Sequence, residues 1–219
     1  MSLYDIPLSI IRDNPWQTRL AIDPDHVAEL AADIKRNGLL QPAVGRVVFD
    51  TAAEFRILST DDVKKLNETD MLGSQRGIYV QLALGHNRRA AFGVLAADEP
   101  DKYGRLPIQI GYYTDEQMAK MAWSENEQRL DLSPLEEAQA IQKAMTDFGW
   151  SQAAAGENFG LGRATVANKL RLLKLPSEVR EQLHSGQISA RQASAMLPLY
   201  SLPESALSWA EDIHSRLPE

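Results

Sequence analysis

The chain has 219 residues, which suffices for one large domain or two modest ones, and its 44% hydrophobic and 24% charged content is ordinary for a globular protein. It contains no cysteine, which excludes disulfides, thiolate metal sites and cysteine nucleophiles. The formal net charge is −7, yet this value does not exclude a nucleic-acid partner, because phosphate binding depends on local rather than summed charge.

Two further signals bear on location. No apolar run approaches the length of about eighteen residues that would predict a membrane helix. The first residues carry an early acid, Asp5, and no basic segment ahead of an apolar stretch, so they do not resemble a secretory signal. We therefore expect a cytoplasmic protein, associated with the nucleoid or a plasmid if it binds DNA, and no membrane partner.

The first half of the chain mixes strand and helix patterns. Asp23 followed by Pro24 is typical of a helix start, and Asn37-Gly38 of a helix end. The polar stretch Ser59–Gly77 predicts a surface insertion that is helical in part. In chain order, the remaining patterns predict strands at Ile6–Ile11, Ala43–Phe49, Glu54–Leu58, Ile78–Leu84 and Leu106–Tyr113.

The second half shows helix patterns only. Ser133 with Glu136 fits a capping box, and Pro134 takes the first helical position. We therefore place a boundary near Asp131, between an α+β N-terminal domain (1–131) and an all-α domain (132–219). The predicted helices are Asp115–Leu130, Pro134–Phe148, Ser151–Asn158, Gly162–Lys174, Ser177–Ser185, Ala190–Leu197 and Pro203–Arg216.

The segment from Trp150 to Leu170 has the pattern of a helix-turn-helix. Ser151 caps a short alanine-rich helix, and Gly160 stands where a tight turn between helices needs a positive φ. In the second helix, the spacing predicts burial of Val166, Leu170 and Leu173. This leaves a polar face that carries basic residues and no acid.

That polar face suits a recognition helix. Arg163 has the geometry to pair with guanine, Asn168 with adenine, and Thr165 lies on the same part of the helix. The cations that follow are expected on phosphates, which set the register without reading sequence: Lys169, Arg171 and Lys174. An ordinary helical hairpin with solvated charges has the same spacing, and this alternative stays open here.

A glycine links a predicted strand directly to a helix at Gly85-His86-Asn87-Arg88-Arg89. Backbone N–H groups at a helix start attract anions, and the adjacent arginines strengthen the positive field. The pattern favours a phosphate-bearing ligand. Arginines in a first helical turn also commonly face water, so the pattern does not decide the matter alone.

The segment Glu125-Asn126-Glu127-Gln128-Arg129 ends another predicted helix. One interpretation of Glu125 and Arg129 at i and i+4 is a surface ion pair. With a phosphate nearby, Glu125 and Asn126 would offer oxygen ligands to Mg²⁺, and Arg129 would contact phosphate. The polar turn Asn14-Pro15-Trp16-Gln17-Thr18-Arg19 offers further hydrogen-bond donors.

Together these segments resemble the ParB family of chromosome and plasmid partition proteins, from about Ile6 to Leu199. The most specific stretch runs from Glu125 to Ala138, because a match of that length is hard to reach by chance. Further similar segments are Asn14–Arg19, Gly38–Pro42, Gly85–Arg89, Val166–Pro176 and Gly186–Ser189.

The resemblance implies a ParB/sulfiredoxin-like N-terminal domain that binds CTP with Mg²⁺, and a helix-turn-helix domain that reads a palindromic double-stranded DNA site. In that family, nucleotide binding closes a homodimer into a clamp that slides along DNA, hydrolysis is slow, and a ParA-type ATPase is the partner. Carried over, Gln17 and Arg19 lie near the nucleotide and Gly85 to Arg89 surround its phosphates. Glu125 and Asn126 coordinate the metal, with Arg129 close by.

The sequence departs from the family pattern after the motif glycine. The family usually has Glu and then Arg there, whereas this chain has His86 and Asn87. Hydrolysis of CTP, and the identity of the nucleotide, therefore stay open. The chain also lacks the family's N-terminal tail and a clear separate C-terminal dimerisation domain, so we expect a truncated chain or a shorter relative.

Two alternatives from other classes remain. A ParB-like nuclease would need a cluster of carboxylates for metal ions, of which only Glu125 can be nominated near the expected pocket. A plasmid or phage transcriptional repressor would use the helix-turn-helix without nucleotide switching. Its affinity for DNA would then not respond to added nucleotide.

Overall fold

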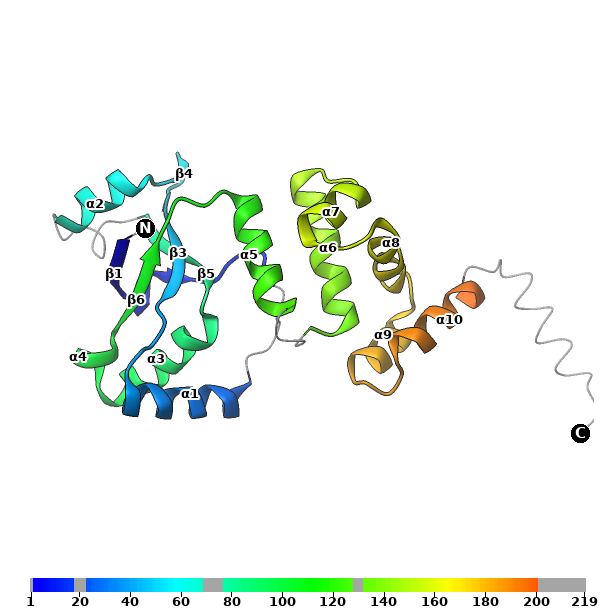
Figure 1. Ribbon diagram of the computed structural model, residues 1–219, viewed down its shortest axis with the longest axis horizontal. Coiled ribbons are helices and arrows are strands. Elements are labelled where there is room, and N and C mark those ends of the chain that lie inside the picture. Colours follow the sequence, from blue (N-terminus) through cyan, green and yellow to red (C-terminus); the bar gives the residue numbers. More distant parts are fainter. Residues whose placement is uncertain (1, 18–22, 69–76, 128–131, 201–219) are drawn as a thin grey trace, which may run out of the picture. The chain divides into compact units, whose positions relative to one another are not determined.

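The computed structural model describes residues 2–17, 23–68, 77–127 and 132–200, with the side chains of 126, 127 and 199 left out (Figure 1). The chain splits into two compact units, Met1–Asp131 and Leu132–Glu219. The described part of the first unit is α+β, and that of the second contains helices alone, which confirms the predicted fold class.

The first unit is built on a mixed sheet. Its described strands lie in the order β1-β6-β3-β5-β2, with β4 paired to β3. The central strand β3 runs antiparallel to β5 and parallel to β6. The strands are β1 (Ser2–Pro7), β2 (Ile11–Arg12), β3 (Ala43–Asp50), β4 (Phe55–Ile57), β5 (Ile78–Leu84) and β6 (Arg105–Ile110).

Helices lie on both faces of this sheet. Successive residues of a strand point to opposite faces: Val80 and Leu82 of β5 belong to the main core, whereas Ala83 packs with Tyr113 and Met118 at the start of α5. Figure 1 shows α1 and α3 side by side next to the sheet, with α5 apart from them. The helices are α1 (Pro24–Asn37), α2 (Thr60–Glu68), α3 (His86–Asp98), α4 (Pro100–Tyr103) and α5 (Asp115–Glu127).

The helix signals in this half were accurate. The side chain of Asp23 accepts a hydrogen bond from the N–H of Asp25, Pro24 is the first residue of α1, and the helix ends before Gly38. A helix, α2, occupies part of the polar stretch 59–77, as predicted.

Two strand predictions were wrong in their bounds. The run Ile6–Ile11 forms two strands rather than one, because a 3₁₀ turn at Leu8–Ile10 redirects the chain: β1 pairs with β6 and β2 with β5. The strand predicted to reach Tyr113 ends at Ile110: the N–H of Gly111 makes a last bond to the carbonyl of Gly45 in β3, and α5 begins at Asp115.

The second unit is a helical bundle whose first helix is capped as the sequence predicts. Ser133 and Glu136 form the capping box of α6, with Pro134 at the first position. Gly160 has a φ of 71° in the turn between α7 and α8, which confirms the predicted helix-turn-helix. The described helices are α6 (Pro134–Phe148), α7 (Gln152–Phe159), α8 (Arg163–Leu172), α9 (Ser177–His184) and α10 (Ala190–Tyr200); the predicted helix Pro203–Arg216 lies outside the described residues.

The buried face of α8 differs in part from the prediction. Val166 is fully buried, but Leu172 is buried in place of Leu170 and Leu173, which are only partly covered. The helix ends at Leu172, and a tighter turn follows in which the N–H of Leu173 bonds to the carbonyl of Leu170. The change of geometry shifts which leucine faces the core that also holds Leu175 and Val179.

Candidate nucleotide pocket and nucleic-acid interface

Gly85 makes the junction between β5 and α3. It is the N-cap of α3 with φ 102°, a left-handed conformation that glycine adopts without strain. A β-carbon added there would lie 2.9 Å from the β-carbon of Ala43. The first turn of α3 contains no acidic residue, so its backbone N–H groups and helix dipole present a positive field at this corner.

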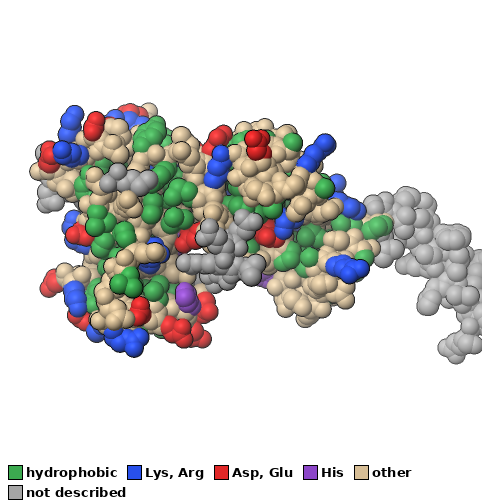
Figure 2. Space-filling view, viewed as in Figure 1, with side chains coloured by type: hydrophobic (Ala, Val, Ile, Leu, Met, Phe, Trp, Pro, Cys, Tyr) green, Lys and Arg blue, Asp and Glu red, His purple; other side chains and the backbone are tan. Residues whose placement is uncertain are grey.

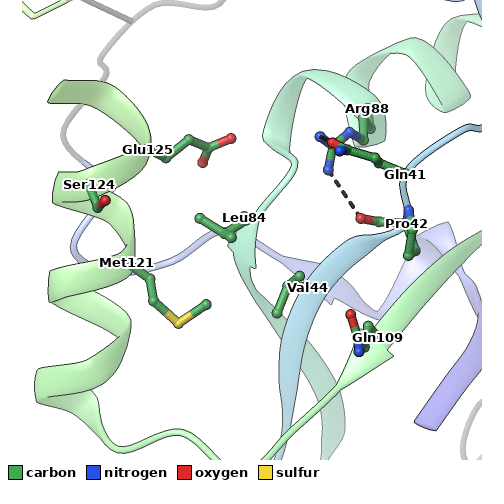
Figure 3. Close-up of a pocket in the computed structure, with 9 residues that line it drawn as sticks. All are labelled: Gln41, Pro42, Val44, Leu84, Arg88, Gln109, Met121, Ser124 and Glu125. Atoms are coloured by element: carbon green, nitrogen blue, oxygen red, sulfur yellow. Dashed lines mark hydrogen bonds between the residues drawn. The ribbon is translucent and has the colours of Figure 1, made fainter. Parts of the chain in front are cut away.

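A pocket of about 560 Å³ opens beside this corner, which is within the size range of small-molecule sites. Its walls come from α5 on one side and from α3 and the segment before β3 on the other, with strand residues between them (Figure 3). The lining residues are Gln41, Pro42, Val44, Leu84, Arg88, Gln109, Met121, Ser124 and Glu125.

Opposite charges stand on opposite walls of this pocket, Arg88 on α3 and Glu125 on α5 (Figure 3). The guanidinium of Arg88 donates to the carbonyl of Pro42 at 3.1 Å and to the side-chain oxygen of Gln41 at 3.2 Å. These bonds hold the cation at the rim. The pocket therefore combines a cation suited to phosphate with a carboxylate suited to a hard metal ion.

The other residues of the glycine turn lie elsewhere. The Arg89 guanidinium donates to the Asp13 carboxylate at 2.6 Å, and both residues line a separate pocket of about 290 Å³ together with His86. Asn87 is half-buried. Of the predicted set from Gly85 to Arg89, the structure thus brings only Arg88 into the lining of the larger pocket.

His86 is buried, with 7% of its surface exposed. Its Nε2 lies 3.5 Å from the backbone N of Asn14, which donates to it, and 4.0 Å from the carboxylate of Asp13. Burial lowers the pKa of His86, while the carboxylates of Glu125 and Asp13 oppose that shift. The ring is therefore held in its neutral form near pH 7.

The Asn14 turn packs beside α5. Its buried side chain donates from Nδ2 to the carbonyl of Met118 at 3.0 Å, and the N–H of Gln17 closes the turn on the Asn14 carbonyl. Gln17 is half-buried but does not line the larger pocket.

Three further predicted residues fall wholly or partly outside the described part of the chain. Arg19 and Arg129 lie outside the described residues, and Asn126 is placed only as part of the backbone of α5.

Sequence reasoning missed most of the pocket wall. Gln41 and Pro42 belong to the segment Gly38–Pro42, and its resemblance to the family is the signal that could have found them. Val44, Leu84 and Gln109 carry no chemical signal of their own, because their strands read as ordinary sheet. The residues of the described chain contain no group of three or more His, Asp or Glu that could hold a metal ion by itself.

In the second unit, α8 presents an exposed face with polar and basic side chains. Val166 is fully buried, whereas Arg163, Thr165, Asn168 and Arg171 are exposed; Lys174 is exposed in the turn that follows. The sequence predicted a helix that extends to Lys174. In the structure α8 ends at Leu172, so Lys174 lies beyond its end.

Lys169 differs from the other basic residues of this group. Its ammonium forms an ion pair with the carboxylate of Glu137 on α6, and the two side chains are only 22% and 23% exposed. Lys169 thus fastens α8 to α6. The remaining predicted DNA-contact residues keep exposed side chains.

Comparisons with known proteins match both halves of the chain. Residues 1–59 match the model of the ParB N-terminal domain, and residues 130–216 match that of the ParB HTH domain. The nucleoid occlusion protein of Bacillus pumilus (strain SAFR-032) is 31% identical over 211 residues, which are 96% of this chain and 61% of that protein. The chain therefore spans about three fifths of that relative's length.

Solved structures show the same likeness. The C-terminally truncated chromosome-partitioning protein ParB from Caulobacter crescentus, complexed to the centromeric parS site, is 25% identical with a TM-score of 0.53, over 98% of this chain and 94% of that chain. The same protein complexed with CTP-gamma-S matches at 28% identity over 90% and 93% of the two chains, with a TM-score of 0.39. Within the described residues, no helix has the length and apolarity needed to cross a membrane.

Proposed function

Because the chain belongs to the ParB family, we propose that its first unit binds CTP with Mg²⁺ and that its second unit binds a palindromic double-stranded DNA site. The observation that carries the proposal is the pocket beside Gly85, with Arg88 and Glu125 on opposite walls. A triphosphate with a divalent cation needs both kinds of group at once.

The division of labour within the pocket follows from chemistry. Arg88 and the backbone N–H groups of His86 and Asn87 at the start of α3 would bind phosphate oxygens. Arg89 already has a carboxylate partner in Asp13, so we assign it an indirect role. Gln17, Arg19 and Arg129 would supply further donors near the nucleotide, as the family resemblance implies.

Glu125 and Asn126 would hold the magnesium ion. Mg²⁺ in nucleotide sites is usually bound by one or two protein oxygens in addition to phosphates and water, and a carboxylate with a neighbouring amide fits that demand. When bound, the ion neutralises part of the triphosphate charge. Glu125 otherwise would repel the phosphates, since it faces the same pocket.

On the DNA side, Arg163, Thr165 and Asn168 would meet base edges in the major groove. Arg171 and Lys174 would bind phosphates, and Lys169 would hold α8 against α6, joining the phosphate contacts only by exchanging Glu137 for a phosphate. We propose that nucleotide binding gates a homodimeric DNA clamp, and, on the family resemblance, that a ParA-type ATPase is a further partner.

The test is a titration of the four nucleoside triphosphates with MgCl₂, with and without a duplex that carries a parS site. We expect CTP to bind most tightly. Arg88→Ala should abolish CTP binding and retain specific DNA binding, because Arg88 lies in the pocket of the first unit; Arg163→Ala should do the reverse. Exposed arginines of the same units, Arg56 and Arg191, serve as matched controls.

Each result bears on one part of the proposal. Equal loss of both activities in either variant would contradict the division of labour between the units. If no nucleotide changes the rate of dissociation from DNA, the result would contradict a nucleotide-gated clamp and favour a repressor that uses the helix-turn-helix alone.

A further inference from the structure

Arg46 is a charged side chain buried in the middle of the central strand β3, with 1% of its surface exposed. Among the described residues, it is the one buried lysine or arginine. A guanidinium in the interior of a sheet is costly in free energy unless its N–H groups find acceptors. The identity of those acceptors therefore indicates what the residue holds in place.

The acceptors of Arg46 belong to β5, to the loop before α5 and to α5 itself. Nε and Nη2 donate to the side-chain oxygen of Gln81 on β5, at 2.9 and 2.7 Å. Nη1 donates to the backbone carbonyl of Tyr113 at 2.9 Å, and Nη2 donates to the carboxylate of Asp115 at 2.6 Å. Arg46 thus ties two neighbouring strands of the sheet to the first residue of α5 and to the loop before it.

These Arg46 contacts act at the end of α5 that is far from the pocket. Asp115 is the first residue of α5, whereas Met121, Ser124 and Glu125 line the pocket further along. At 1.5 Å of rise per residue, Asp115 and Glu125 are separated by about 15 Å along the helix. A small tilt at the start of the helix would therefore displace Glu125 by a much larger amount.

We propose that Arg46 is a positioning residue for the pocket: it fixes the start of α5 to the sheet, so that Glu125 and Ser124 stand across the pocket from Arg88. The bond from Asn14 to the carbonyl of Met118 is a second tether on the same helix, one turn further along. The identity of the ligand rests on the proposed function, but the effect of Arg46 on α5 does not.

The experiment uses the full chain with two variants that break the Arg46 contacts, Arg46→Met and Asp115→Ala. Asp115 is partly exposed, so its variant folds even where the loss of the buried arginine prevents folding. The matched control is Glu116→Ala, which removes an exposed acid from the same first turn and so changes the helix dipole interaction equally. Arg46→Lys keeps the charge and one bond and should rescue in part.

Two readouts are compared: hydrogen exchange of the α5 amides relative to those of β5, and the Kd for CTP with MgCl₂. We expect Arg46→Met and Asp115→Ala to speed exchange in α5 at least tenfold more than in β5 and to raise the Kd at least tenfold. Glu116→Ala should change neither the exchange rate nor the Kd by more than about twofold, since it leaves the Arg46 contacts intact.

Two results would overturn the positioning role. One is a normal Kd in a folded variant that lacks the Arg46 contacts. The other is exchange accelerated equally in α5 and β5, which denotes a general loss of stability. If the unaltered chain binds no CTP, the proposed function fails instead. The exchange pattern alone then decides whether Arg46 positions α5.

Discussion

At position 86 a histidine ring is buried where the sequence pattern led us to expect a ligand contact. Its neutral form is favoured because burial penalises the imidazolium. The ring accepts a hydrogen bond from the backbone of Asn14, whose side chain in turn bonds to α5. His86 therefore links the start of α3 to the Asn14 turn, a role that residue type and spacing do not reveal.

The buried ring predicts a pH dependence of stability. The pKa of His86 in the folded chain lies below its ordinary value of 6.5, so the unfolded chain takes up a proton first as the pH falls. Its contribution is fully present above about pH 6.5 and is lost as the pH falls toward the folded pKa, at no more than about 1.4 kcal/mol per pH unit.

His86→Gln should show a flatter dependence of unfolding free energy on pH, since glutamine does not titrate. Urea unfolding of both proteins between about pH 7.5 and pH 5.5 checks this. Parallel curves for the two proteins would mean that the ring is protonated equally in the folded and unfolded chain.

A second prediction concerns the carboxylate of the pocket. Glu125→Gln keeps the size of the side chain and removes its charge, so it should weaken CTP binding in the presence of MgCl₂ by at least about tenfold. Without divalent cation the same variant should bind as well as the unaltered chain or better, because the repulsion between carboxylate and phosphate is gone. Isothermal titration with MgCl₂ and with EDTA separates the two conditions; equal weakening in both would contradict a metal-binding role.

Among the predicted site residues, Arg88 and Glu125 line the larger pocket, whereas residues whose role depends on their neighbours were missed. Arg88 and Glu125 were selected because charge at a helix start or end is visible in the sequence. Val44 and Leu84 were not, because the sequence pattern of a strand shows only which of its residues lie on the same face of the sheet. Arg46 was missed for the same reason: nothing in the sequence shows that Gln81 and Asp115 meet it.

At the scale of the element, the junction of β5 with α3 depends on one glycine. Gly85→Ala combines a positive φ with a β-carbon 2.9 Å from that of Ala43, and should destabilise the first unit by about 1–3 kcal/mol and weaken CTP binding. In Gly93→Ala, the added β-carbon meets nothing within 4 Å inside the same helix, so this control should be neutral or stabilising by up to about 1 kcal/mol. Urea unfolding measures both; equal stability of the two variants would show that the left-handed turn is not required.

Helices were predicted more accurately than strands, and the reason is local. The caps at Asp23 and Ser133 act within a single turn, so a few residues of sequence determine where each helix begins. The break between β1 and β2 depends instead on two different pairing partners, β6 and β5. Those partners lie some seventy residues or more further along the chain, beyond the range of any local pattern.

At the scale of the whole molecule, an acidic chain carries a locally basic helix. The face of the first unit seen in Figure 2 mixes acidic and basic side chains rather than gathering one sign. From Gly160 to Leu175, by contrast, the sequence contains Arg163, Lys169, Arg171 and Lys174 and no acid. DNA affinity should therefore depend on few phosphate contacts.

Lys174→Ala should weaken binding to specific and non-specific duplexes alike and reduce the slope of log K against log salt concentration by about 0.9, the value for one phosphate contact. Fluorescence anisotropy at several salt concentrations measures the slope. Arg191→Ala, at an exposed position of α10, is the control and should leave the slope unchanged. A loss confined to one DNA sequence would mean that Lys174 contacts a base.

The four cations near α8 are already counted in the formal net charge of −7, so the remainder of the chain is more negative still. A duplex would repel most of this surface and attract one short stretch of it. Encounters with DNA should therefore lead to binding mainly when this basic stretch faces the duplex, so the charge distribution orients the protein before any base is contacted. The same repulsion should weaken binding to non-specific DNA. Several copies should then gather on one duplex only where specific contacts outweigh that repulsion.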